Sequence, residues 1–163
     1  MKIIISCIMV CLLTLSVNYI TLCNTTNDSI VATYKLEQES KQDTILKSTK
    51  YKLLAKVINS ESHGESFKSK LHVGSVVLNR TKDSNFPNTI KKVIYQRNQF
   101  DGIGTKYFRF SNKTKDDVDS KRAALYLLMN GSINDDILYF HNPDIVNKRV
   151  TKILVKVDKQ IFY

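Results

Sequence analysis

A glutamate at the end of an apolar stripe is the residue of this sequence best suited to acid–base chemistry. Over residues 49–62 the apolar side chains recur at helical spacing, and Glu61 lies four residues after Val57 and three after Ile58. Its carboxylate is therefore expected on the buried face. Loss of water raises the pKa of a carboxyl group, which makes it a proton donor and acceptor near neutral pH. Cleavage of a glycosidic bond needs such a group.

A second carboxylate, Glu65, follows one helical turn later. Two carboxylates would suit a nucleophile and an acid. Gly64 is expected to end the helix between them, so Glu65 need not share the face of Glu61. Spacing alone also allows Glu61 to turn outward and pair with a lysine, and that alternative stays open.

Other classes of catalytic site find less support in the sequence. The histidines His63, His72 and His141 show no metal-ligand spacing, and all three cysteines precede Asn24. We therefore expect no metal, no cofactor and no Cys nucleophile, and no Gly-x-Ser-x-Gly elbow is present. The pair His141-Asn142 in a basic chain raises the alternative of an exported nuclease, although no second cluster of His and acid accompanies it.

Four helices and a small sheet are predicted to position these residues. Apolar periodicity predicts helices over residues 49–62, 66–80, 89–96 and 115–130, then a strand over 137–140 and a hairpin over 153–163. Gly74 in mid-helix costs about 1 kcal/mol relative to Ala, which indicates close packing there. Residues 99–114 are expected to form a loop. Helices followed by strands predict an α+β domain.

Charge and cysteine content divide the chain of 163 residues into three parts. Residues 1–23 hold the cysteines and an uncharged apolar run, typical of a signal peptide, or of a retained anchor because about 20 residues can just cross a bilayer. Residues 24–48 are polar and predict a loosely ordered linker. Residues 49–163 carry 21 basic and 11 acidic side chains, so the net charge of +10 belongs to the folded domain. That charge predicts an anionic partner: nucleic acid, a membrane surface or an acidic wall polymer.

Six motifs then occur in one order along the folded domain. They are Leu54-Ala55-x-x-Ile58-x-x-Glu61-x-x-Gly64-Glu65, Val73-Gly74-Ser75-Val76-Val77-Leu78-Asn79-Arg80, Phe86-Pro87-Asn88-Thr89-Ile90, Val93-Ile94-Tyr95-Gln96, Gln99-Phe100 and Leu138-Tyr139-Phe140-His141-Asn142-Pro143. This series resembles the catalytic domain of spore cortex-lytic cell wall hydrolases of the SleB/CwlJ type. The resemblance covers about residues 53–162. Ser62 and His63 stand where that family usually has a small residue and Arg.

The resemblance implies a lysozyme-like or lytic-transglycosylase-like fold, with a mainly helical lobe and a small antiparallel β-lobe. It also implies an enzyme that cleaves peptidoglycan between N-acetylmuramic acid and N-acetylglucosamine, with Glu61 as the catalytic acid/base. Because no second carboxylate is convincing, we expect a lytic transglycosylase, with a hydrolytic muramidase or glucosaminidase as the alternative. The residues expected to bind substrate are Gln99, Phe100, Tyr139 and Asn142, and those expected to support Glu61 are His63 and Glu65. For Phe100 a core position, and for Asn142 a turn, are the open alternatives.

The apolar leader predicts export whether it is cleaved or retained, and the resemblance implies that the exported domain acts at the cell wall or the spore envelope. Peptidoglycan is its expected partner, with spore cortex hydrolysis during germination as the setting within the sporulation cycle. We expect a monomer that binds no nucleic acid and that meets a membrane only if the N-terminal segment is retained. A peptidoglycan-binding relative without catalytic activity is the remaining alternative.

Overall fold

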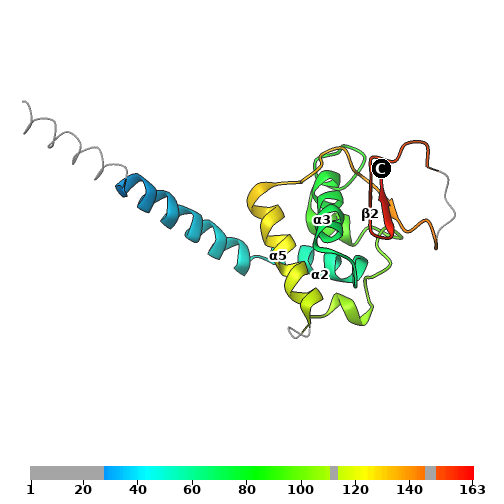
Figure 1. Ribbon diagram of the computed structural model, residues 1–163, viewed down its shortest axis with the longest axis horizontal. Coiled ribbons are helices and arrows are strands. Elements are labelled where there is room, and N and C mark those ends of the chain that lie inside the picture. The colour runs from blue at the N-terminus through cyan, green and yellow to red at the C-terminus, as the bar shows by residue number, and fades with distance from the viewer. Residues whose placement is uncertain (1–27, 111–113, 146–149) are drawn as a thin grey trace, which may run out of the picture. The chain divides into compact units, whose positions relative to one another are not determined.

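The computed structural model describes residues 28–110, 114–145 and 150–163 (Figure 1). The predicted leader, residues 1–23, lies outside them. Residues 28–47 are helical, which corrects the prediction of a loosely ordered linker. This stretch contains no Gly or Pro and is rich in Lys, Glu, Gln and Leu, which favour helix. Across the described residues no helix has the length and apolar run needed to cross a bilayer.

Contacts divide the chain into two compact units, residues 1–41 and residues 42–163, and the second unit holds the folded domain. Its helices are α2 (Thr49–Glu61), α3 (Phe67–Arg80), α4 (Ile90–Ile94) and α5 (Lys115–Asn130), with a short 3-10 helix η1 (Lys106–Phe108). All four predicted helices are confirmed. Each begins after a hydroxyl side chain that accepts a backbone N–H of the first turn; these caps are Ser48, Ser66, Thr89 and Thr114.

The sheet has three short strands, β1 (Phe140–His141), β2 (Val155–Val157) and β3 (Gln160–Phe162), in the order β1-β3-β2. Both pairings are antiparallel. The predicted hairpin is confirmed as β2 and β3. The first strand begins later than predicted, because Leu138 and Tyr139 both donate their N–H groups to the backbone oxygen of Tyr163.

The core is formed mainly by α2, α3 and α5, which lie together in Figure 1, with the sheet at the side of α3. A Cβ on Gly74 would collide with the side chains of Ile58 and Leu127, so the close packing predicted at this glycine is confirmed. Phe162 of β3 is fully buried in the same core and joins the sheet to the helices. The predicted α+β class is confirmed, and α2 carries Glu61 at its last position.

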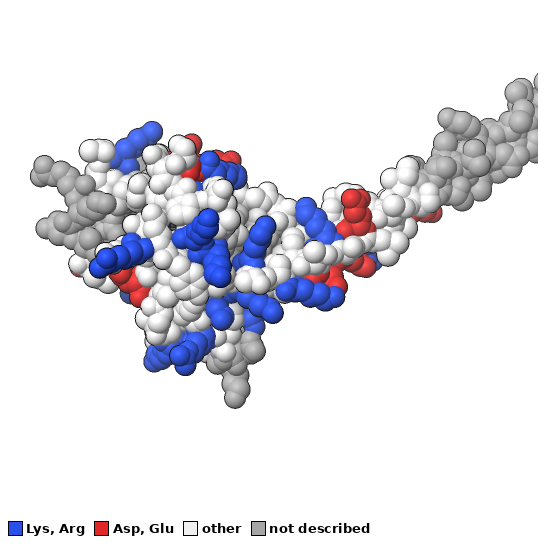
Figure 2. Space-filling view, turned by 180° about the vertical axis from the view of Figure 1, so that it is seen from behind, with Lys and Arg blue, Asp and Glu red and all other residues white. Residues whose placement is uncertain are grey.

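Among the charged side chains on the face of the domain seen in Figure 2, most are basic. Lys and Arg side chains are spread widely over that face, and Asp and Glu are few. This agrees with the predicted excess of positive charge in the folded domain.

Candidate active site

The carboxyl group of Glu61 is held at the C-terminal end of α2 by a loop. The backbone N–H of Gly102 donates to Glu61 Oε1 at 2.7 Å. Burial raises the pKa of Glu61 to about 7, the Gly102 N–H opposes this rise, and the negative charge of Asp101 adds to it. Glu61 is half-buried and its carboxyl faces this loop, as the apolar stripe predicts. Near neutral pH it exists in both protonation states, as an acid/base catalyst requires.

Gly102 lies where no larger residue fits. A Cβ at this position would lie 2.6 Å from Ser60 Cβ and 2.7 Å from Glu61 Oε1. The absence of a side chain lets the loop backbone reach the carboxyl group. The sequence analysis did not identify Gly102, although the Gly-x-Gly segment that begins two residues after Phe100 is a signal of close backbone approach.

The backbone of Glu61 and Ser62 is fixed by two side chains from elsewhere in the chain. Gln160 of β3 donates from Nε2 to the backbone oxygen of Glu61 at 2.9 Å, and its own Oε1 accepts from Ser69 Oγ at 3.0 Å. The next backbone oxygen, that of Ser62, accepts from Lys70 Nζ at 2.6 Å. The last carbonyl groups of a helix have no partner within the helix. Gln160 and Lys70 supply these partners and so fix the position of Glu61.

Lys70 also fixes the turn that follows Glu61. Its side chain is 1% exposed and pairs with Asp116 Oδ1 at 2.6 Å, and the same oxygen accepts the Gly64 N–H at 3.2 Å. Burial raises the pKa of Asp116, but the hydrogen bond and charge of Lys70, the Gly64 N–H and His63 together bring it below its ordinary value. Asp116 is therefore ionised at neutral pH and holds α5 against this turn.

Replacing Lys70 with Met is expected to destabilise the domain by about 3 kcal/mol, because Asp116 and the Ser62 carbonyl lose a buried cationic donor. Urea unfolding at pH 7 measures the loss. Lys68→Met is the matched control: Lys68 is exposed on the same helix, and a change there is expected to cost under about 0.5 kcal/mol. Equal stability of the two variants would show that the Lys70–Asp116 pair contributes nothing.

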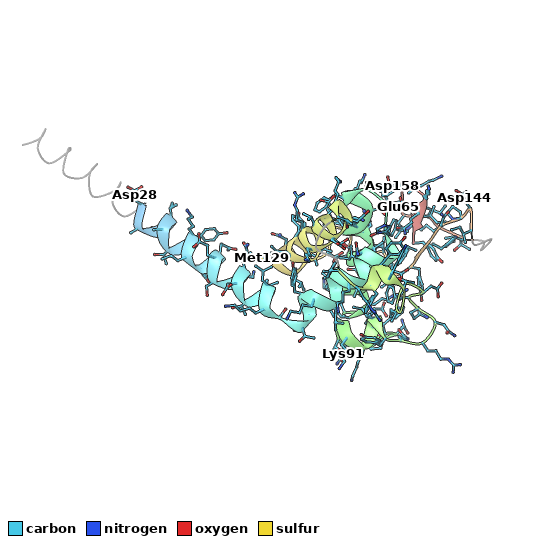
Figure 3. All side chains as sticks on the ribbon, turned by 90° about the horizontal axis from the view of Figure 1, so that it is seen from below. Asp28, Glu65, Lys91, Met129, Asp144 and Asp158 are labelled. Carbon is cyan, nitrogen blue, oxygen red and sulfur yellow. The ribbon has the colours of Figure 1, made fainter. Side chains whose placement is uncertain are left out.

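The two residues expected to support Glu61 lie on different sides of this turn. His63 stacks on Tyr107, with 3.9 Å between the ring centroids. Glu65 lies close to Asp158 in the turn between β2 and β3, and the two are labelled side by side in Figure 3. Within the described part of the chain no contact joins Glu65 to Glu61, so the geometry gives no support to a pair of catalytic carboxylates made by these two residues.

Two of the residues expected to bind substrate, Phe100 and Asn142, make contacts within the domain instead. Phe100 is 6% exposed and packs in the core, with its ring centroid 6.4 Å from that of Phe140. No face of the ring is free for a sugar, so the prediction that it binds substrate is wrong and the core alternative holds. Asn142 Oδ1 accepts the backbone N–H of Asp144 at 2.9 Å, which is the turn alternative.

Tyr139 and Gln99 remain accessible. Tyr139 is 39% exposed, stacks on Tyr163 with 5.5 Å between centroids, and lines a cavity of about 490 Å³. Tyr163 follows Gln160 by three residues, so the tyrosine pair and the Glu61 backbone contact lie at opposite ends of β3, about 10 Å apart at the rise of an antiparallel strand. Gln99 is half-buried in the turn before Phe100. Across the described residues no three His, Cys, Asp or Glu side chains cluster as a metal site would require.

Comparison with known sequences places this site in a family. Residues 64–163 match the model of the Cell Wall Hydrolase family. The spore cortex-lytic enzyme of Bacillus cereus is 28% identical over 114 residues, which are 68% of this chain and 42% of that protein. The spore cortex-lytic enzyme of Bacillus subtilis is 27% identical over 94 residues, which are 57% of this chain and 29% of that protein. The chain thus spans less than half the length of these relatives.

Solved structures show the same fold. The catalytic domain of the Bacillus cereus SleB protein superposes with a TM-score of 0.60 at 26% identity, covering 69% of this chain and 88% of that one. The catalytic domain of the germination-specific lytic transglycosylase SleB from Bacillus anthracis gives a TM-score of 0.60 at 25% identity, covering 71% and 94%. The predicted lysozyme-like fold is confirmed. The chain belongs to the Cell Wall Hydrolase family, and its folded domain is a catalytic domain of the SleB/CwlJ type.

Proposed function

We propose that this domain cleaves the glycan strands of peptidoglycan as a lytic transglycosylase, with Glu61 as its acid and base. The observation that carries the proposal is the Glu61 carboxyl, whose pKa of about 7 and contact with Gly102 suit proton transfer in both directions. The family match begins three residues after Glu61, so the role of this residue rests on its geometry and on the resemblance of its motif.

The Gly102 contact supports a different role for each carboxyl oxygen of Glu61 in the proposed reaction. Because the Gly102 N–H donates to Oε1, the proton of the neutral acid belongs on Oε2. Oε2 gives this proton to the glycosidic oxygen between N-acetylmuramic acid and N-acetylglucosamine, and the C1–O bond breaks. The N-acetyl group of the substrate stabilises the charge at C1. Oε2 then takes the proton of the C6 hydroxyl, whose oxygen bonds to C1 and leaves a 1,6-anhydro end.

A hydrolytic muramidase is the second candidate function, and Asp101 is the observation that favours it. Its carboxylate is exposed on the loop that holds Glu61, and its charge contributes to the raised pKa of Glu61. In that mechanism Asp101 would activate a water or attack C1 itself. It is a different second carboxylate from Glu65, which contacts Asp158.

Mass spectrometry of the released muropeptides distinguishes the two functions. We expect products that end in the 1,6-anhydro ring when the protein digests purified peptidoglycan. Products that carry an added water would contradict the transglycosylase proposal, and loss of these products in Asp101→Asn would then identify the second carboxylate. Co-sedimentation with the wall without any soluble product would indicate a binding protein that lacks catalysis.

The names of the relatives support a more specific setting. The proposal includes export to the cell wall or spore envelope, action on spore cortex during germination, and a monomeric enzyme with Tyr139 and Gln99 in contact with the glycan. Parallel digests of cortex and of vegetative wall test the substrate, because a cortex enzyme is expected to release products from the first and few from the second.

A further inference from the structure

Another cavity lies at the C-terminal end of α2, with Asn59 and His63, each two residues from Glu61, in its lining. It has a volume of about 470 Å³, and its walls include Asn59, His63, Lys106, Tyr107 and Arg109. Asn59 and His63 come from the end of α2 and the turn after it, the segment that carries Glu61. Lys106, Tyr107 and Arg109 come from η1 and the residue after it, and η1 begins four residues after Gly102. The same two segments that position the acid therefore enclose this cavity.

The walls of the cavity are joined by contacts within the domain. Asn59 is 2% exposed and donates from Nδ2 to the backbone oxygen of Tyr107 at 2.8 Å and to Asp117 Oδ1 at 3.1 Å. The rings of His63 and Tyr107 lie 3.9 Å apart at an interplanar angle of 25°. These contacts fix the Asn59, His63 and Tyr107 walls of the cavity relative to one another.

Its open side carries positive charge. Lys106 and Arg109 are both exposed, and among the described residues no carboxylate forms an ion pair with either. Lys106 Nζ lies 5.0 Å from the centre of the Tyr107 ring, which holds the ammonium group at the cavity wall. The one acid in the lining, Asp117, is 3% exposed and accepts from Asn59. An anionic group is the complementary ligand.

We propose that this cavity binds the carboxylate-bearing substituent of the glycan strand, with Arg109 and Lys106 as its anion contacts. The inference rests on the proposed function, because N-acetylmuramic acid bears its lactyl and peptide substituent on C3 of the ring whose C1 reacts at Glu61. That substituent begins within one sugar ring of the acid, and the lining residues Asn59 and His63 are each two residues from Glu61. An arginine fork and a lysine ammonium pair with carboxylates, and the volume is in the range of small-ligand sites.

The test compares native glycan strands with strands whose carboxylates have been converted to amides by a carbodiimide and ammonia. On native strands the double variant Lys106→Ala/Arg109→Ala is expected to lose roughly 100-fold in kcat/KM, about tenfold for each charge-assisted contact, through KM with kcat little changed. On amidated strands the wild type and the double variant should be equal.

Lys50→Ala/Lys52→Ala is the matched control. It removes the same two charges from exposed positions at the start of α2, about 15 Å from Glu61 along the helix. Equal losses of kcat/KM in both double variants would mean that the charges act only through long-range attraction of the anionic strand, and would overturn the proposed role of the cavity. So would a wild-type kcat/KM that amidation leaves unchanged.

Binding separates failure of this inference from failure of the proposed function. If the wild type cleaves neither substrate, the proposed function fails. Dissociation constants measured by co-sedimentation with native and with amidated strands then still test whether the cavity binds carboxylates. Weaker binding of native strands by the Lys106/Arg109 double variant than by the Lys50/Lys52 control supports the inference. Equal binding of native and amidated strands by the wild type contradicts it.

Discussion

Replacement of Glu61 by Gln is expected to abolish strand cleavage while it stabilises the fold at alkaline pH. Glutamine keeps the volume of the side chain and an amide oxygen that can accept the Gly102 N–H. It cannot give a proton to the glycosidic oxygen or accept one from the C6 hydroxyl. Loss of an acid/base group lowers kcat by about 100- to 10,000-fold, measured as muropeptide release.

The gain in stability follows from the raised pKa of Glu61. Its carboxyl binds a proton more tightly in the folded state, with a pKa of about 7, than at its ordinary value of 4.5. The folded state is therefore disfavoured progressively as the pH rises from 4.5 to 7, and the full cost applies above pH 7. That cost is at most about 3 kcal/mol, and Gln does not carry it. Urea unfolding should show equal stability of variant and wild type at pH 4 and a more stable variant at pH 8.

Glu65→Gln is the matched control for the activity measurement. Glu65 lies one turn further along the chain, beside Asp158, so this variant should cleave peptidoglycan. A Glu61→Gln protein that still releases muropeptides would assign the acid to another residue. A variant no more stable than the wild type at pH 8 would show that the Glu61 carboxyl is hydrated in the folded protein.

The helices and the inward direction of Glu61 could be predicted from the sequence because both depend on local pattern. The apolar stripe of α2 and its capping Ser48 specify one helix, and that helix alone determines on which face Glu61 lies. Residues 28–47 show where composition misleads: their polarity indicated a linker, whereas the absence of Gly and Pro and the supply of helix formers favour the observed helix.

The contacts that hold the acid could not be predicted, because they join segments far apart in the chain. Gly102 and Gln160 follow Glu61 by 41 and 99 residues. In the sequence Lys70 cannot be distinguished from the exposed lysines. Only the fold brings its ammonium group to Asp116 and to the Ser62 carbonyl inside the domain. Residue type alone also could not decide whether Phe100 binds substrate or packs in the core, since an aromatic ring suits both.

The substitution Gly102→Ala is expected to lower kcat by about 100-fold without unfolding the domain, because a shift near 1 Å in a catalytic group has that effect. The new Cβ would lie 2.6 Å from Ser60 Cβ, which cannot swing away, so the loop must move off the end of α2. The 2.7 Å hydrogen bond to Glu61 Oε1 then lengthens or breaks. Muropeptide release under saturating substrate measures kcat, and the melting temperature reports on the fold.

Two further readouts distinguish a displaced carboxyl from general damage to the domain. The Gly102 N–H lowers the pKa of Glu61, so its loss should move the alkaline limb of the kcat profile to higher pH. Ser60→Gly removes the Cβ that collides with the methyl group introduced by Gly102→Ala, at about 0.5 kcal/mol of helix stability. The double variant Ser60→Gly/Gly102→Ala should therefore recover part of the activity. A Gly102→Ala enzyme with wild-type kcat and an unchanged pH profile would show that the loop does not position Glu61. Recovery in the double variant would instead identify the close approach of loop and helix as the constraint that requires glycine.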